Sequence, residues 1–224
     1  MLRLMIGAAT AVWLLCASTA GAAEPPTVKF NWAGETFAAP IPAGYCVPTG
    51  AYIDLAATVA KAEVDNETLV TLYDCAAMAE KRISARSILI KGQRRAVGDH
   101  VTRAQLLNQF KTMPKSDLAS ALATQPGAVK DAKGKDADID FKMDMTLQPV
   151  AADDFGVYVA GLLKMQTSKE AKAVSVAFAI TAIRTHPLLY YVFNQGTSVS
   201  DIAAALDETK AGVRALVAAN EPGT

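Results

Sequence analysis

The sequence predicts an α+β domain in which helices pack against an antiparallel sheet. Residues 138–147 alternate apolar and polar side chains, a period of two that is typical of a strand with one solvated face. The apolar segments 155–167 and 173–184 flank a five-residue polar link, so we expect them to pair as a hairpin. Residues 198–220 carry apolar side chains at helical spacing, which predicts a helix that covers the sheet.

The N-terminus has the pattern of a secretory signal peptide. Arg3 supplies a positive charge, Leu4–Cys16 is apolar, and Ala20-Gly21-Ala22 offers the small residues that signal peptidase accepts. We therefore expect residues 1–22 to be a signal peptide, with cleavage after Ala22 or Ala23. A membrane anchor is the alternative, but the apolar run is too short to span a bilayer comfortably.

The remaining chain is expected to be one exported domain. Residues 23–33 contain Pro25-Pro26 and are predicted to form a flexible leader, and residues 34–224 a single α+β domain. No second apolar run is long and charge-free enough to cross a bilayer, so we expect no transmembrane segment in the mature chain. In a bacterium, export would place this domain in the periplasm, which is an oxidising compartment.

Short strands and helices are expected in the first half of the domain. In order, these are a strand over 34–41, a helix over 54–64, a strand over 68–75 followed by a short helix, and helices over 102–113 and 116–125. Pro40 and Pro42 close the first strand because proline cannot extend a central ladder. Asn66 would also suit the cap of a helix in place of the second strand. Thr102 and Gln105 form a capping box, which marks the start of a helix.

The second half begins with a polar loop over 127–135, and the predicted sheet strands follow it. His186-Pro187 is expected to form a turn before 188–193, whose residues are apolar on both faces and predict a central strand. Ser198 and Asp201 form a second capping box. The apolar stripe of this last helix consists of Val199, Ile202, Leu206, Val213, Leu216 and Val217. Gly212 would let the helix backbone approach the sheet closely.

Two segments carry a resemblance to a known family. They are Phe37-Ala-Ala-Pro-Ile-Pro-Ala-Gly-Tyr45 and the tail from Thr181 through Pro187-Leu188 to Asn220. With this order of elements, the chain resembles the PsbP/Mog-like α/β sandwich. The resemblance implies a non-catalytic accessory or binding protein and names no ligand. The cysteine pair and the helix near Thr102 depart from the simplest form of that pattern.

Two cysteines, Cys46 and Cys75, remain once the signal peptide is removed. A disulfide between them would close a loop worth about 3.5 kcal/mol of chain entropy, and it suits an oxidising compartment. The alternative is a metal site that adds His100 and His186. Because none of the four lies at a short ligand spacing, we predict the disulfide and no metal.

Other chemical motifs are incomplete or missing. Asp136, Asp138 and Asp140 imitate a calcium loop, but Phe141 replaces its glycine and Leu147 its closing glutamate, so a solvated strand face explains them better. The chain has no G-x-S-x-G elbow, glycine-rich phosphate loop or zinc-protease helix. A hydrolase whose site is assembled from distant residues stays the alternative, and no cofactor is expected.

Charge is balanced overall, with 22 basic and 22 acidic residues, which excludes nucleic-acid binding through bulk positive charge. Basic residues nevertheless gather between 81 and 103, and acidic ones between 131 and 154. Either these charges scatter over a solvated surface, or they form a basic face for an anionic partner. The candidate contacts are Arg82, Arg86, Lys91, Arg94 and Arg95.

Together these observations predict an exported, non-catalytic binding or accessory protein of the bacterial cell envelope. Its partner would be an envelope protein or an anionic envelope component, such as a lipid headgroup or an envelope polymer. A periplasmic hydrolase is the alternative. A deep polar pocket around His100 or His186 would favour the hydrolase, and a filled interior would favour binding.

Overall fold

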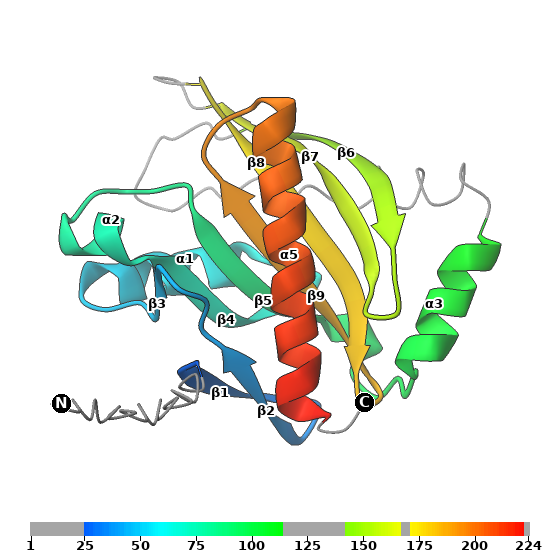
Figure 1. Ribbon diagram of the computed structural model, residues 1–224. Coiled ribbons are helices and arrows are strands. Elements are labelled where there is room, and N and C mark those ends of the chain that lie inside the picture. Colours follow the sequence, from blue (N-terminus) through cyan, green and yellow to red (C-terminus); the bar gives the residue numbers. More distant parts are fainter. Residues whose placement is uncertain (1–24, 114–141, 167–170, 222–224) are drawn as a thin grey trace, which may run out of the picture.

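The computed structural model describes residues 25–113, 142–166 and 171–221 (Figure 1). The strands are β1 (Thr27–Trp32), β2 (Glu35–Pro40), β3 (Tyr45–Cys46), β4 (Asn66–Asp74), β5 (Ser87–Gln93), β6 (Lys142–Ala152), β7 (Val157–Gln166), β8 (Ala171–Ile183) and β9 (His186–Asn194). The helices are α1 (Ala51–Ala62), α2 (Cys75–Ala79), α3 (Arg103–Thr112) and α5 (Val199–Asn220), and Arg94–Ala96 forms one 3-10 turn.

The main sheet has seven strands in the order β3-β4-β5-β9-β8-β7-β6, and neighbouring strands are antiparallel. This arrangement confirms the predicted α+β class. The predicted hairpin is β7–β8, in which Val157 faces Ile180 and Gln166 faces Ala171. Since β9 occupies the middle of the sheet, its residues are covered on both faces, as the apolar run 188–193 predicts.

Helix α5 and the separate β1–β2 hairpin cover one face of the sheet (Figure 1). The stripe of α5 meets this face through Val213, Leu216 and Val217, which are buried, whereas Val199 is exposed at the first turn. Asn220 fastens the end of the helix to β2, because its side chain accepts from Ala38 N–H and donates to Ala38 C=O. The main core lies between these layers.

Gly212 is where α5 comes closest to the sheet. A Cβ placed there would lie 2.3 Å from the hydroxyl oxygen of Tyr190 on β9. The predicted close approach is therefore confirmed, and only glycine fits it without a shift of the helix or the ring.

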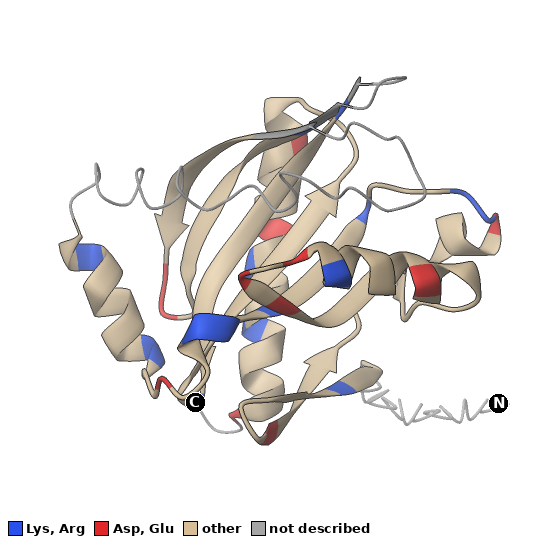
Figure 2. Cartoon of the chain, turned by 180° about the vertical axis from the view of Figure 1, so that it is seen from behind, with Lys and Arg blue, Asp and Glu red and all other residues tan. Residues whose placement is uncertain are grey.

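The opposite face carries α1 and α3. Strand residues alternate between faces, so Val159 and Phe178 point away from α5 and pack with Phe110 and Met113, in and just after α3. At the other end of the sheet, the Tyr52 ring of α1 lies 5.5 Å from that of Tyr73 on β4. Figure 2 views the molecule from this side.

The flexible leader predicted for residues 23–33 is wrong over Thr27–Trp32, which form β1. Phe30 and Trp32 are only 6% and 4% exposed, because every second side chain of β1 turns into the core. Their strand partner is β2, with Phe30 opposite Phe37. The two prolines at 25 and 26 lie just ahead of the strand and do not interrupt it.

The turn predicted at His186-Pro187 is also wrong. The chain reverses at Arg184 and Thr185, where Arg184 has a φ of 56°, and His186 is already the first residue of β9. Strand β5 was not among the predicted elements. The predicted signal peptide, the helix over 116–125, the loop over 127–135 and residues 138–141 lie outside the described residues.

Candidate functional site

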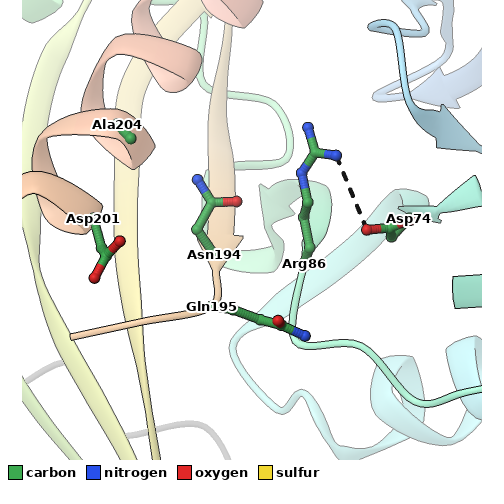
Figure 3. Close-up of a pocket in the computed structure, with 6 residues that line it drawn as sticks. All are labelled: Asp74, Arg86, Asn194, Gln195, Asp201 and Ala204. Carbon is green, nitrogen blue, oxygen red and sulfur yellow. Dashed lines mark ion pairs between the residues drawn. The ribbon is translucent and has the colours of Figure 1, made fainter. Parts of the chain in front are cut away.

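A polar cleft lies where β4, β5 and β9 end beside the first turns of α5 (Figure 3). Its volume is about 240 Å³, and it is lined by Asp74, Arg86, Asn194, Gln195, Asp201 and Ala204. We call it the Arg86 cleft. Its residues come from three regions of the sequence, around Asp74, around Arg86 and between Asn194 and Ala204, so the fold itself assembles it.

Among the described residues that line this cleft, Arg86 is the only cation, and its ion pairs are loose. Nη2 lies 3.3 Å from Glu208 Oε1, and Nη1 lies 4.0 Å from Asp74 Oδ2. Charge-assisted hydrogen bonds are usually about 2.7–2.9 Å long, and a guanidinium has about five N–H donors. The Arg86 side chain is 35% exposed, so its two long contacts leave N–H donors for a group that enters the cleft.

Tyr45 forms a platform for this arginine. The Arg86 guanidinium carbon lies 4.4 Å from the centre of the Tyr45 ring, which is a cation–π contact. The residue is only 3% exposed, and its hydroxyl lies near Glu208 and Arg86 without forming a hydrogen bond of good geometry to a described residue. Burial, reinforced by the nearby carboxylate of Glu208, raises the pKa of this phenol well above its usual value, so Tyr45 stays neutral.

A disulfide fixes this end of the molecule. Cys46 is bonded to Cys75, as the cysteine count predicts. The preceding residues, Tyr45 and Asp74, face each other across β3 and β4, and Cys75 N–H donates to Gly44 C=O over 2.9 Å. The crosslink therefore holds the platform and one carboxylate of the cleft in register. Because both sulfurs are bonded to each other, the alternative metal site at these cysteines is wrong.

The carboxylates around the cleft each have a structural partner as well. Asp74 caps α2 by accepting from the backbone N–H groups of Ala76 and Ala77. The hydroxyl and backbone N–H of Ser198 donate to Asp201, which holds the pKa of that carboxyl below its usual value. Glu208 accepts from the Asn194 amide over 3.2 Å. The site therefore presents a cation, fixed anions and amide groups within one small volume.

The other predicted anion contacts do not converge on this cleft. Arg82 pairs with Glu80, and Arg94, at the opposite end of β5 from Arg86, pairs with Glu67. Eight residues of strand correspond to about 26 Å, so one small partner cannot span both ends. Figure 2 shows blue and red segments close together along this side of the molecule.

Lys91 cannot act as a surface contact. Its side chain is 7% exposed and its ammonium pairs with Glu63, whose side chain is 5% exposed. The prediction that Lys91 contacts a partner is therefore wrong. Its ammonium lies in the protein interior, where it pairs with Glu63, 28 positions away in the sequence. Arg95 is exposed and makes no ion pair with a described residue.

His186 joins the β1–β2 hairpin to the start of β9, and His100 lies against His186 beside the β8–β9 turn. His186 is buried, and its Nε2 lies 3.0 Å from Glu35 Oε1, while Glu35 also pairs with Arg184. The rings of His186 and His100 are 5.5 Å apart, and His100 Nδ1 lies 3.1 Å from Thr185 Oγ1. Hydrogen bonds from His186 and then Arg184 hold the pKa of Glu35 below its usual value.

Neither histidine lines either of the two clefts found in the described part of the chain. They are absent from the Arg86 cleft and from a second cleft of about 350 Å³ beside Arg103, Asp154 and Glu221. Within the described ranges, no group of three or more His, Cys, Asp or Glu side chains is placed to hold a metal ion. Asp136, Asp138 and Asp140 lie outside those ranges.

Sequence reasoning found Arg86 but missed Tyr45, Asp74, Asn194 and Glu208. No short motif connects them, since they lie on β3, β4, β9 and α5. One signal was available: Tyr45 and Asp74 each precede a cysteine of the predicted pair. A disulfide brings the neighbours of its cysteines together, so the predicted pair could have been used to place Tyr45 near Asp74, although it was not used in this way.

No protein-family model matches the chain, and no curated protein matches it at a significant level. The resemblance to the PsbP/Mog-like sandwich therefore stays a prediction. None of the helices in the described part of the chain is long and apolar enough to cross a membrane.

Proposed function

We propose that this protein is an exported, non-catalytic binding protein of the bacterial cell envelope, and that its ligand occupies the Arg86 cleft. The proposal rests on the environment of Arg86. Its guanidinium is stacked on a buried ring, loosely paired, and open to a cleft of about 240 Å³. Pockets for drug-sized ligands measure about 300–1,000 Å³, so this one suits a small group or the end of a longer molecule.

The signal-peptide pattern and the disulfide support export. Arg3, the apolar run and Ala20-Gly21-Ala22 fit a cleaved leader. The bond between Cys46 and Cys75 suits the periplasm, because structural disulfides persist in oxidising compartments. The resemblance to PsbP/Mog-like proteins adds support for an accessory role.

Binding fits the geometry better than hydrolysis does. A hydrolase assembled from distant residues would need its nucleophile and base in a pocket that holds the substrate. His186 instead bonds Glu35 in the protein interior, and the His100–Thr185 pair lies outside both clefts. The carboxylates of the Arg86 cleft serve as helix caps instead: Asp74 caps α2, and Asp201 completes the capping box of α5.

The cleft chemistry indicates a zwitterionic ligand. A carboxylate would take the free donors of Arg86 and displace the 4.0 Å contact to Asp74. The ammonium group of the same ligand would then lie near the carboxylates of the cleft. The side-chain amides of Asn194 and Gln195 suit hydrogen bonds to a peptide group. Amino acids and short peptides combine these groups, and peptides crosslink the bacterial cell wall. We therefore propose an amino acid or a peptide end as the ligand.

Isothermal titration calorimetry with amino acids and short cell-wall-type peptides tests this function. Arg86→Met should weaken the binding of the best ligand at least tenfold, since hydrogen bonds to a charged group contribute about 1.5–3 kcal/mol. Arg214→Met is the matched control. Arg214 also stacks on a ring, that of Phe155 at 5.4 Å, and pairs with an aspartate, Asp153, but lies away from the cleft.

The expected result is loss of affinity in Arg86→Met and wild-type affinity in Arg214→Met, with both variants folded by circular dichroism. If every ligand of the panel fails to bind, or if Arg86→Met binds as tightly as wild type, the Arg86 cleft is not the ligand site.

A further inference from the structure

A second surface lies at the outer corner formed by α2 and the start of α1. Ile83 is 84% exposed, Ile53 56% and Val47 42%. Lys81 and Arg82 are exposed beside Ile83. We call these five residues the Ile83 corner. Single exposed apolar residues are ordinary on a protein surface. A set of them indicates an interaction site only if the segments that carry them are held in a fixed arrangement.

Covalent and hydrogen bonds tie its three segments together. The Cys46–Cys75 disulfide joins the segment of Val47 to α2. The hydroxyl of Tyr52, next to Ile53, donates to the backbone carbonyls of Arg82 over 2.6 Å and Ala77 over 3.3 Å. The apolar side chains of the corner are therefore carried by one braced unit.

The loop that carries Ile83 is held in a strained conformation. Arg82 N–H donates to Ala77 C=O and Lys81 N–H to Met78 C=O, which together make a Schellman motif at the end of α2. Lys81 has a φ of 54° at the position that glycine usually occupies in this motif. Glycine would make the folded protein more stable at this position. The presence of lysine therefore indicates that its side chain has a role other than stability.

The chemistry of the corner fits a lipid surface. Peripheral proteins bury apolar side chains at the boundary between headgroups and acyl chains, while Lys and Arg meet anionic headgroups. Lys81 makes no ion pair with a described residue, so its charge is available, whereas the charge of Arg82 is compensated by the exposed Glu80 at 2.7 Å. Figures 1 and 2 both place α2 at the outer edge of the molecule, which suits shallow insertion better than the broad contact of two proteins.

We propose that the Ile83 corner docks the protein on an anionic lipid bilayer. Ile83, Ile53 and Val47 enter the headgroup region and Lys81 contacts lipid phosphates, while Arg82 stays paired with Glu80 at the edge of the contact. This docking uses no group of the Arg86 cleft, so it holds whether or not the cleft binds a zwitterion.

Vesicle co-sedimentation of the chain without residues 1–22 tests the proposal. The vesicles are phosphatidylethanolamine with phosphatidylglycerol, and neutral phosphatidylcholine vesicles serve for comparison. Wild type should sediment with the anionic vesicles only, and less so as salt is raised. Ile83→Asp should weaken partition at least tenfold. Lys81→Gly should weaken it about fivefold, the equivalent of about 1 kcal/mol for one basic residue near an anionic surface.

Two variants separate docking from folding. Lys81→Gly relieves the positive φ, so it should match or exceed wild type in thermal stability while docking less. Val64→Asp is the matched control, because Val64 is 83% exposed just beyond the opposite end of α1 and should dock as wild type does.

Absence of wild-type sedimentation with anionic vesicles would overturn the proposal and leave the corner for a protein partner or for solvent. Equal docking by Ile83→Asp and wild type, or equal loss in Ile83→Asp and Val64→Asp, would also overturn it.

Discussion

The Arg86 guanidinium rests on the ring of Tyr45, and the disulfide residue Cys46 directly follows that ring in the chain. This relationship joins a covalent constraint to a binding group. The strand pair β3–β4 sets Tyr45 opposite Asp74, and the disulfide locks that pair. The cleft therefore has a rigid floor, and a ligand loses little affinity to ordering it.

Tyr45→Phe should leave the protein as stable as wild type or up to about 1 kcal/mol more stable, since the lost hydroxyl is buried without a partner. Tyr45→Leu removes the ring beneath Arg86, so it should lower both the free energy of unfolding and ligand affinity. Urea denaturation measures the first quantity and calorimetry the second. A cost above about 1 kcal/mol for Tyr45→Phe would show that the hydroxyl does have a partner.

Cys46→Ala with Cys75→Ala should lower the free energy of unfolding by about 3.5 kcal/mol, because the crosslink closes 29 residues of sequence separation. Affinity at the Arg86 cleft should fall with it, since Tyr45 and Asp74 lose their fixed register. Denaturation of the double variant and of the reduced wild type should agree. Unchanged affinity in the folded double variant would show that the strand pairing alone keeps the site in place.

Lys91→Met should lower the free energy of unfolding by about 3–5 kcal/mol, because it leaves the buried Glu63 carboxylate without its counter-charge. Lys91→Met combined with Glu63→Leu should lose much less, since both charges are then gone. Denaturation of the two single variants and the double variant gives the coupling between the residues. A loss below 1 kcal/mol for Lys91→Met alone would mean that water reaches the pair.

Much of the fold could be predicted because its strongest elements carry local patterns. The pairing of β7 with β8 and both capping boxes of α3 and α5 follow from residues close together in the sequence. Strand β5 was missed because Lys91 interrupts an apolar run. A charge can be buried there only because Glu63 neutralises it, and Glu63 belongs to a different element.

The site was less predictable for the same reason. Arg86 attracted attention as part of a basic run, but its partners Asp74 and Glu208 lie on elements that only the tertiary fold brings near. Counting charges along the sequence suggested a basic face. In the structure, Arg82, Arg86, Lys91 and Arg94 each have a carboxylate within ion-pair distance.

Acid should destabilise the protein partly through Asp153. Burial alone would raise the pKa of this carboxyl, but donors from Phe155, Tyr158, Arg214 and Gly156 together hold it below the usual 3.8. The folded state therefore gains stability above the unfolded pKa of 3.8, and this gain is lost as pH falls through the lower, folded pKa. Asp153→Asn should be less stable at neutral pH and should show a shallower loss in acid.

Urea midpoints between about pH 2.5 and 7 measure this effect, since carboxylate linkage acts below about pH 5. Asp54→Asn, a change to an exposed carboxylate on α1, serves as the control and should follow the wild-type profile. Parallel acid profiles for Asp153→Asn and wild type would contradict the assignment.

Gly212→Ala tests the contact between α5 and the sheet. Alanine is favoured over glycine in a helix by about 1 kcal/mol, so helix propensity alone predicts a gain in stability. The new Cβ would instead lie 2.3 Å from the Tyr190 hydroxyl oxygen and 2.4 Å from Cζ, and the rigid ring cannot move aside. We expect a net loss of about 1–3 kcal/mol in the free energy of unfolding, as for other overpacked cores. The same change made in a Tyr190→Leu background should cost less or become stabilising, because the obstructing ring is gone. Denaturation of the four proteins of this cycle gives the coupling energy, and equal costs in both backgrounds would show that α5 shifts to accommodate the methyl group.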